Sequence, residues 1–427
     1  MQEVDALASD AFLPWSTLLC FTTSVMRQVA LYFTILAFSF ACLPACAQSA
    51  PNTSEDENAL KETTQGLCRS QVAMLGESAT HGDGHMLAFK VALVERLIDQ
   101  CRFDTVFFEA NHDEFIHLNK RFGQGQSVTS EDLLSAVGGL WKFYREFQPL
   151  APFLLQRAQT GRVFLGGLDD QLGQLGQNYA NYEMVDELTN LLPQTERQSC
   201  RTALHKRVYY DYSEAAPYSK VDHSQIETCL SEIQAASLAD KATTGVDKEE
   251  REEMISAAQR WIHRDLTPDA ENAINRDRSM FQNFEWLQSR LPKRHKVIVW
   301  AATVHIAKQG DPTWGDRSGT NLGSFIHREY GRNVYSLGFS AVSGSYRRGK
   351  GSFPMMPTAP LNSVEVRTLQ QDGSASASYV GQPRLAARGT VPGAFFRHSY
   401  QTLPWSSFLD GVVVFQTEQP PSDVRDK

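Results

Sequence analysis

The sequence predicts an α/β protein whose sheet is mostly parallel and flanked by helices. Three observations support this class. Short apolar runs recur with the length and the bounding residues of buried strands, segments with helical spacing alternate with them, and several runs end at an acid or a histidine. Strand patterns crowd the C-terminal part, which predicts added antiparallel strands there. Because such sheets open into a crevice at the carboxyl ends of their strands, we expect functional side chains at that edge.

Residues 1–47 have the pattern of a targeting segment. Arg27 precedes an apolar run from Val29 to Leu43, and Ala45-Cys46-Ala47 has the small-x-small pattern of a signal peptidase site. The run is shorter than the about 20 residues of a transmembrane helix, so we expect no stable span in the mature chain. We therefore predict export to the periplasm or the medium with cleavage after Ala47. A lipoprotein signal is the alternative, which Pro44 disfavours.

Cleavage there would leave 380 of the 427 residues. Residues 48–66 are predicted to be a flexible tether, because their first part is polar and contains proline. The remainder, 67–427, is predicted to form one large α/β domain with a helical insertion, and two closely packed domains are the alternative. Within it, residues from about 179 to 264 are polar, charged and mostly helical in pattern, which predicts a helical insertion that covers the site.

Charge and cysteine content limit the partners. The net charge of −8 comes without a basic stripe, so a nucleic-acid partner is not expected. Four cysteines remain after cleavage, an even number that permits two disulfides in an exported chain. Proximity favours Cys68 with Cys101 and Cys200 with Cys229 among three connectivities. No Cys-x-x-Cys spacing occurs, so a cysteine metal site is not expected.

The elements follow from these patterns in chain order. Apolar or β-branched runs predict strands at 72–75, 105–108, 162–165, 297–300, 333–339, 376–380 and 408–415. Leu87, Val91 and Val94 recur at helical spacing and predict a helix at 86–100. Similar patterns predict helices within 114–159, from 275 to the residue before Pro292, and around Phe325.

Polar side chains at the predicted strand ends suggest hydrolysis. Glu77 and His81 follow the first strand, Glu109 ends the second and His305 follows the fourth. A histidine is a natural general base near neutral pH, and a carboxylate from Glu77 or Glu109 would fix its tautomer. His305 and Lys90 would stabilise the oxyanion formed when water attacks an ester or amide carbonyl. From spacing alone, solvent-exposed loop residues remain the alternative.

The same residues carry a family resemblance. The run from Leu75 to Gly82, Leu-Gly-Glu-Ser-Ala-Thr-His-Gly, resembles the Gly-Glu-x-Thr-His-Gly opening of the erythromycin esterase family. Further similarities extend over nearly the whole mature chain: Lys90, Phe108-Glu109-Ala110, Trp141 with Phe147-Gln148-Pro149-Leu150, Gly167-Leu168-Asp169, Arg276-Asp277, Trp300 through His305, and Asp410-Gly411. The fold that the resemblance implies agrees with the strand pattern.

The resemblance implies hydrolysis of a small-molecule ester by a water molecule that His81 activates. In the best-known members the ester is a macrolide lactone, so a role in the response to an antibiotic is implied. Glu77 and Glu109 would orient or polarise the reacting groups. Lys90 would take the place of the family's basic residue, and His305 would line the site. Trp141, Asp169 and Arg276 are the expected substrate-binding residues. No cofactor is expected.

A metal-dependent hydrolase of the peptidase type is the alternative, because the wider superfamily that the chain resembles includes metal-dependent members. In that case His81, His85, Glu77, Glu109 and His305 would hold a divalent ion.

The sequence departs from the family pattern at two places. Three residues, instead of two, separate Glu77 from His81, and such an insertion can rotate Glu77 out of position. Ala302 and Thr303 stand where the family often has His-Asn. The missing histidine favours a ligand-binding protein without turnover, whereas the joint presence of His81, Glu109, Lys90 and His305 favours an enzyme. A Gly-x-Ser-x-Gly elbow is absent, which disfavours a serine hydrolase.

Overall fold

The computed structural model describes residues 56–172, 179–292, 294–315, 319–371, 373 and 376–425. The predicted targeting segment and residues 48–55 of the predicted tether lie outside this part. The rest of the tether prediction is wrong, because Glu57–Leu67 forms helix α1. Its charged residues face solvent, while Leu60 and Leu67 recur at helical spacing and are buried together with Thr63 and Thr64. The buried stripe was hidden in the sequence by the polar residues around it.

A seven-stranded sheet is the centre of the fold. Its order is β3-β2-β4-β1-β5-β9-β6, and every neighbouring pair is parallel except β6 and β9. The predicted α/β class with a mostly parallel sheet is therefore confirmed. The strands are β1 Val72–Leu75, β2 Thr105–Asn111, β3 Phe164–Asp169, β4 Val297–Trp300, β5 Val334–Gly344, β6 Ala377–Gly381 and β9 Gly411–Glu418.

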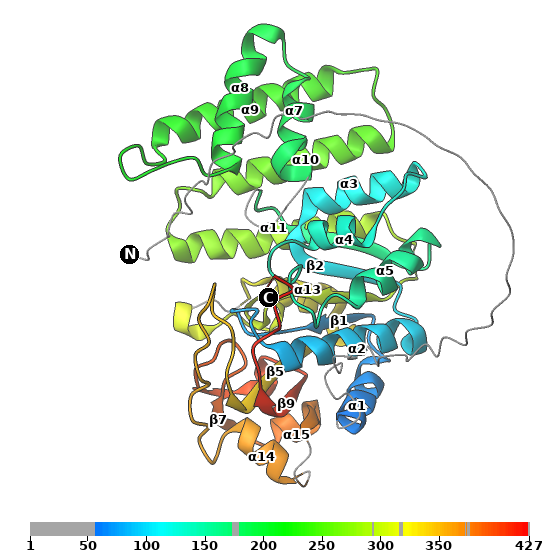
Figure 1. Cartoon of the computed structure of the whole chain (residues 1–427), viewed down its shortest axis with the longest axis vertical. Coiled ribbons are helices and arrows are strands. Elements are labelled where there is room, and N and C mark those ends of the chain that lie inside the picture. Colours follow the sequence, from blue (N-terminus) through cyan, green and yellow to red (C-terminus); the bar gives the residue numbers. More distant parts are fainter. Residues whose placement is uncertain are drawn as a thin grey trace, which may run out of the picture. The chain divides into compact units, whose positions relative to one another are not determined.

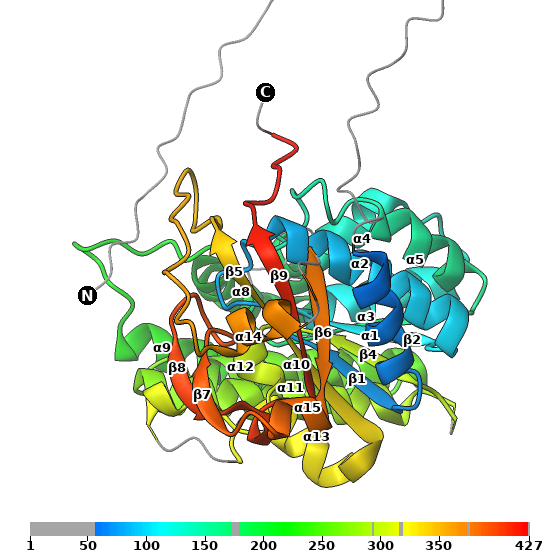
Figure 2. The ribbon, with the colours of Figure 1, turned by 90° about the horizontal axis from the view of Figure 1, so that it is seen from below.

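The C-terminal strands differ in detail from the prediction. β9 runs parallel to β5, so within the seven-stranded sheet only β6 is antiparallel to its neighbour, as Figure 2 shows for the three side by side. Two further strands, β7 Thr390–Gly393 and β8 Gln401–Pro404, pair with each other in a separate antiparallel sheet. The sequence did not indicate this pair, because each strand contains a proline and proline argues against a strand in pattern reading.

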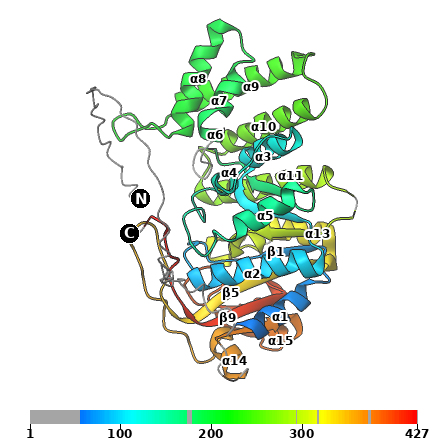
Figure 3. The ribbon, with the colours of Figure 1, turned by 45° about the vertical axis from the view of Figure 1, so that its right-hand side comes forward.

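Helices cover both faces of the sheet, because alternate strand residues point to opposite sides. Ala73 and Leu75 of β1 join a core with α1, α2, α4 and α5, whereas Val72 and Met74 join a core with α11, α13 and α14. Figure 3 shows α2 alongside β1 and β5. The bounds are α2 Gly84–Cys101, α3 His112–Gly123, α4 Ser130–Val137, α5 Leu150–Gln159, α11 Asp269–Ser289, α12 Thr303–Ile306, α13 Leu322–Tyr330, α14 Val364–Gln371 and α15 Gln382–Ala386.

The segment predicted as a helical insertion, 179–264, is made of helices and has its own apolar core. These helices, green in Figure 1, follow β3 in the chain and precede α11 and β4. They are α6 Tyr179–Tyr182, α7 Met184–Thr189, α8 Gln194–Val208, α9 Lys220–Ala239 and α10 Val246–His263. Helix α9 begins at a capping box that Ser219 and Asp222 form at its N-terminus. None of the helices among the described residues combines the length and the apolarity needed to cross a bilayer.

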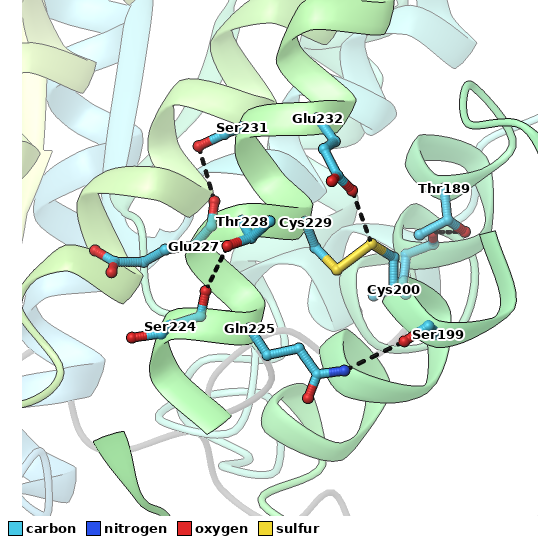
Figure 4. The surroundings of a disulfide bond; sticks show 11 residues. Thr189, Ser199, Cys200, Ser224, Gln225, Glu227, Thr228, Cys229, Ser231 and Glu232 are labelled. Carbon is cyan, nitrogen blue, oxygen red and sulfur yellow. Dashed lines mark hydrogen bonds between the residues drawn. A yellow bond between two sulfur atoms is a disulfide. The ribbon is translucent and has the colours of Figure 1, made fainter. Parts of the chain in front are cut away.

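Both predicted cysteine pairings are confirmed. Cys200 on α8 and Cys229 on α9 are joined, with their Cα atoms 5.4 Å apart (Figure 4). Cys68 and Cys101 are joined with a Cα separation of 5.0 Å, which ties the C-terminal ends of α1 and α2 together. Structural disulfides form and persist in oxidising surroundings, so the pairs indicate an oxidising compartment for the folded chain.

A carboxyl group buried near the helical insertion gives a testable stability prediction. Asp113, at the start of α3, is fully buried, and neither of its carboxyl oxygens has a hydrogen-bond partner among the described residues. Burial raises the pKa of Asp113 well above its usual value, and the nearby carboxylates of Glu253 and Asp170 add to this effect. The folded chain therefore keeps this proton at a pH where an unfolded chain has released it.

We expect Asp113→Asn to stabilise the protein, and increasingly so as the pH rises. Between the unfolded and the folded pKa of Asp113 the folded state binds more protons, so the free energy of unfolding of the natural protein falls with pH, while an amide has no proton to lose. A gain of about 1–3 kcal/mol is expected near pH 8 and much less near pH 4. Urea unfolding at several pH values measures it, with the exposed Asp247→Asn as control. A gain that does not change with pH would contradict the prediction.

Candidate active site

The pairing register brings four strand ends to one edge of the sheet. Leu75 of β1 lies opposite Trp300 of β4, which lies opposite Phe108 of β2, which in turn lies opposite Gly167 of β3. The residues that follow this row therefore meet at the carboxyl edge, as expected for parallel strands. They are Glu77 after β1, Glu109 on β2, Asp169 on β3, and the turn from Ala301 to His305 after β4.

Glu77 and His81 form a direct pair. The His81 Nδ1 lies 2.6 Å from the Glu77 Oε1, so the imidazole donates there and the neutral tautomer carries its free lone pair on Nε2. The longer turn therefore leaves Glu77 in contact with His81. His81 adopts a φ of 52°, and its backbone N–H donates to the Ser78 carbonyl at 3.0 Å, which closes the turn.

The surroundings shift the pKa values of Glu77 and His81 in opposite directions. Burial opposes the ionisation of Glu77, but the Lys90 ammonium and the His81 imidazole outweigh it, so the pKa of Glu77 lies below its usual value. Burial also disfavours the His81 imidazolium, yet the bond and the charge of Glu77, with a contribution from Glu109, raise the pKa of His81. His81 is therefore a stronger base than a free imidazole.

Lys90 and Trp141 both donate hydrogen bonds to Glu77. The Lys90 Nζ donates to the Glu77 Oε2 at 3.0 Å and lies 4.1 Å from the centre of the Trp300 ring. The Trp141 Nε1 donates to the Glu77 Oε1 at 3.0 Å, and its ring stands edge-on to His81. Both side chains are completely buried, and burial lowers the pKa of Lys90 to about 8. The structure therefore places them as supports of Glu77, away from the oxyanion and substrate contacts expected for them.

A second cluster surrounds Arg276, which α11 contributes. The Arg276 Nη2 donates to the Glu109 Oε1 at 2.9 Å and to the Asp169 Oδ2 at 2.6 Å. Glu109 is held further by the Ala302 backbone N–H, which donates to its Oε2 at 2.8 Å. Burial opposes the ionisation of Glu109, but His305 and Arg276 lower its pKa well below the usual range. Glu109 is therefore a fixed anion that orients two cations.

His305 on α12 is the second of these cations. Its Nδ1 lies 2.7 Å from the Asp277 Oδ1, and its Nε2 lies 3.2 Å from the Glu109 Oε1 and 3.0 Å from the Arg276 Nη1. Burial disfavours the imidazolium, but Asp277 and Glu109 raise the pKa of His305 to about 10. As an imidazolium it donates through both nitrogens. The two carboxylates offset the electrostatic repulsion between the imidazolium and the Arg276 guanidinium. Sequence reasoning missed the role of Asp277, whose one signal was its place beside Arg276.

The Glu77–His81 pair and the cluster around Arg276 interact, and they expose only some of their side chains to solvent. Glu109 raises the pKa of His81, and His81 lowers that of Glu109, so the groups interact. The cationic or basic side chains keep some exposure, 12% for His81, 8% for His305 and 17% for Arg276, while Glu77 and Asp169 have none. A ligand therefore meets the two imidazoles and the guanidinium, with the carboxylates beneath them.

The residues at the family's His-Asn positions act through their backbones. Ala302 N–H binds Glu109, as described, and Thr303 N–H donates to the Glu77 carbonyl at 2.8 Å. A Cβ at Gly76 would lie only 2.4 Å from the Thr303 Oγ1, so the glycine allows this close approach. The turn after β4 thus joins the two clusters without a second histidine.

The metal alternative has little geometric support among the described residues. His85 points elsewhere, because its Nε2 lies 2.5 Å from the Asp56 Oδ2 and its Nδ1 lies 3.0 Å from the Thr417 carbonyl. In the described part of the chain, the group of three metal-type side chains whose donor atoms lie within 4.8 Å of one another is Cys200, Cys229 and Glu232. Its two sulfurs are bonded to each other, as Figure 4 shows, and so are not free to bind an ion.

Comparisons with known proteins bear on the family and the fold of the chain. A model described as erythromycin esterase matches residues 98–383, more than half of the chain. The match contains Glu109, Arg276 and His305 but begins after Glu77 and His81. A putative hydrolase, YbfO of Bacillus subtilis (strain 168), is 21% identical over 360 residues, which cover 79% of this chain and 78% of the relative.

Two solved structures share the fold. A mutant of erythromycin esterase EreC in its open conformation superposes with a TM-score of 0.64 at 12% identity, covering 86% of this chain and 96% of that one. A succinoglycan biosynthesis protein gives a TM-score of 0.64 at 15% identity, covering 86% of this chain and 92% of that one. At these identities the superpositions show the fold alone.

Proposed function

The chain belongs to the erythromycin esterase family, and from this membership we propose that it hydrolyses a small-molecule ester with a water molecule activated by His81. We further propose that the protein acts outside the cytoplasm, in the periplasm or the medium. The two disulfides support this location, as does the predicted targeting segment. A macrolide lactone is the first ester to test, and its hydrolysis would make the protein part of a response to that antibiotic.

The proposed reaction uses the two clusters in turn. The Nε2 of neutral His81 takes a proton from water while the water oxygen attacks the ester carbonyl carbon. Arg276 donates a hydrogen bond to the resulting oxyanion, and the positive charge of the His305 imidazolium stabilises it further. When the tetrahedral intermediate collapses, the bond between the carbonyl carbon and the ester oxygen breaks. The imidazolium of His81 then returns its proton to the leaving alkoxide, which regenerates the base.

One observation carries this proposal. The His81 Nδ1 is bound to a buried anion, Glu77, at 2.6 Å, in a strand-end site whose other exposed groups are cations. A base with a fixed tautomer beside two cations is an arrangement that supports water attack on a carbonyl. The reaction as proposed uses no metal ion.

The test is hydrolysis of chromogenic short-chain esters and several macrolides by the purified protein over a range of pH. We expect kcat/KM to rise with pH through an acid limb whose midpoint lies above 6.5, because His81 must be neutral and its pKa is raised. In Glu77→Gln the carboxylate that raises this pKa is gone, so the limb should move to lower pH. Glu109→Gln gives the same test with a smaller shift if the first variant does not fold.

Rates for the natural protein equal to those of both variants across the whole panel would overturn the proposal. An acid limb below 6.5 in the natural protein would contradict His81 as the base. Elemental analysis of the purified protein, with assays before and after dialysis against a chelator, tests the metal-free reaction. Activity that disappears with the chelator and returns with a divalent ion would favour the metal-dependent alternative.

A further inference from the structure

The turn that carries His81 has a backbone conformation that its neighbours must hold. With a φ of 52°, His81 is one of three non-glycine residues with positive φ among the described residues, beside Arg102 and Tyr210. The left-handed region costs an L-residue about 1–2 kcal/mol, and such strain persists only where surrounding contacts determine it. The contacts of residues 78–83, here called the His81 turn, therefore decide where the imidazole points.

Two segments from the C-terminal third of the chain hold the His81 turn. The Ala79 N–H donates a hydrogen bond to the carbonyl of Phe396, which lies in the connection between β7 and β8, at 3.2 Å. The segment after β5 donates the Arg347 N–H to the Gly82 carbonyl at 2.8 Å, and a Cβ at Gly82 would lie 1.9 Å from the Arg347 carbonyl oxygen. The backbone of the turn is thus fixed before and after His81.

His398, from the same connection as Phe396, adds a side-chain contact that spans the turn. Its Nε2 lies 3.2 Å from the Thr80 Oγ1 and 3.2 Å from the Asp83 Oδ1. The ring is buried and stacks on Tyr346, with the ring centres 3.6 Å apart. One nitrogen therefore reaches the residue just before His81 and the residue that precedes α2.

The donor and acceptor roles follow from these contacts. The His398 Nδ1 is buried and has no hydrogen-bond partner among the described residues, whereas its Nε2 faces a carboxylate and a hydroxyl. The ring is therefore best placed with a proton on Nε2, where it donates to the Thr80 hydroxyl, while the Asp83 Oδ1 lies at ion-pair distance without a hydrogen bond. The Thr80 hydroxyl is then free to donate to the Ser78 Oγ at 3.3 Å. His398 acts here as a donor, and it does not activate Thr80 as a nucleophile.

We propose that His398 is a positioning residue for His81, which it keeps on Glu77 by joining Thr80 to Asp83 across the turn. This inference rests on the proposed function, because the group that it positions is the proposed general base. Without the bond, the His81 backbone relaxes toward ordinary φ values in part of the molecules, and the contact between Nδ1 and Glu77 is lost in them. The chemical step slows while substrate binding is retained.

The test compares His398→Ala, His398→Gln and Thr80→Val in the full chain, with His263→Ala, an exposed histidine on α10, as control. We expect kcat to fall roughly 10- to 100-fold in His398→Ala and Thr80→Val with KM unchanged, since small misplacements of catalytic groups cost this much. Combining the two changes should cost no more than either alone. His398→Gln, whose amide also donates, should recover most of kcat.

A second measurement does not depend on activity. NMR titration of His81, assigned by comparison with a His81 variant, should show its pKa moving from a raised value toward about 6.5 in His398→Ala and Thr80→Val but not in the control. Folded variants with an unchanged His81 titration and an unchanged kcat would overturn the inference. So would losses of kcat that only follow the fraction of folded protein. If the natural protein hydrolysed no ester, the proposed function would fail, while the titration would still decide the role of His398.

Discussion

Replacing His81 with alanine is expected to lower kcat/KM by about 10²- to 10⁴-fold, because a positioned general base contributes this much to hydrolysis. KM should change little, since His305 and Arg276 remain at the exposed floor of the site. The fold should persist, because the Glu77 carboxylate keeps its bonds from Lys90 and Trp141. Steady-state kinetics on the most reactive ester of the panel measures the loss.

The matched control is His263→Ala, which removes an imidazole that is 83% exposed on α10. We expect the control to keep the rate of the natural protein. A His81→Ala protein that stays within a few-fold of the control would show that another group activates the water. Addition of free imidazole should restore part of the rate if the missing group is a base, because the cavity left by the side chain can admit it.

Replacing Lys90 with methionine is expected to destabilise the fold by about 3–5 kcal/mol, the usual cost of removing one partner of a buried ion pair. Lys90 and Glu77 are both fully buried and 3.0 Å apart. Methionine fills similar space but leaves the carboxylate without its ammonium. Urea unfolding monitored by circular dichroism measures the change, and the surface variant Lys120→Met, whose ion pair with Asp247 is exposed, should cost less than about 1 kcal/mol.

The double variant Lys90→Met with Glu77→Gln separates charge from packing. If the loss comes from the uncompensated carboxylate, the second change should recover part of the stability despite the extra substitution. Additive losses would show that Lys90 contributes through packing against Trp300 and not through its charge on Glu77.

Much of the candidate site could be predicted because its chemistry lies beside short apolar runs. Val72–Leu75 and Val297–Trp300 are recognisable strands, and parallel strands end at a common edge, so residues that follow them meet. Glu77, His81, Glu109 and His305 were therefore expected at one edge without any knowledge of long-range contacts, and the folded chain brings them there. The disulfide pairing followed in the same way, from proximity in the chain.

The remaining features depend on contacts between distant segments, which a local pattern does not carry. Asp277 belongs to a helix whose sequence shows amphipathicity, so its place beside Arg276 was the one signal for it, and its bond to His305 was not indicated. The burial of Lys90 depends on Trp141 and Trp300 closing over it, although a lysine near a crevice is expected to reach solvent. His398 follows a proline-containing strand that the pattern did not reveal, and it meets the His81 turn only in the folded chain.

The position of β1 in the middle of the sheet has a consequence for how the protein is made. Val72 pairs with Val297 on one side and with Val334 on the other, so this early strand has no partner until most of the chain has been synthesised. Pairings of such wide sequence separation form slowly, because a long loop must close before any contact rewards it. The centre of the sheet therefore cannot close until β5 has been synthesised, and until then the apolar strand that precedes His81 stays unpaired and prone to aggregation.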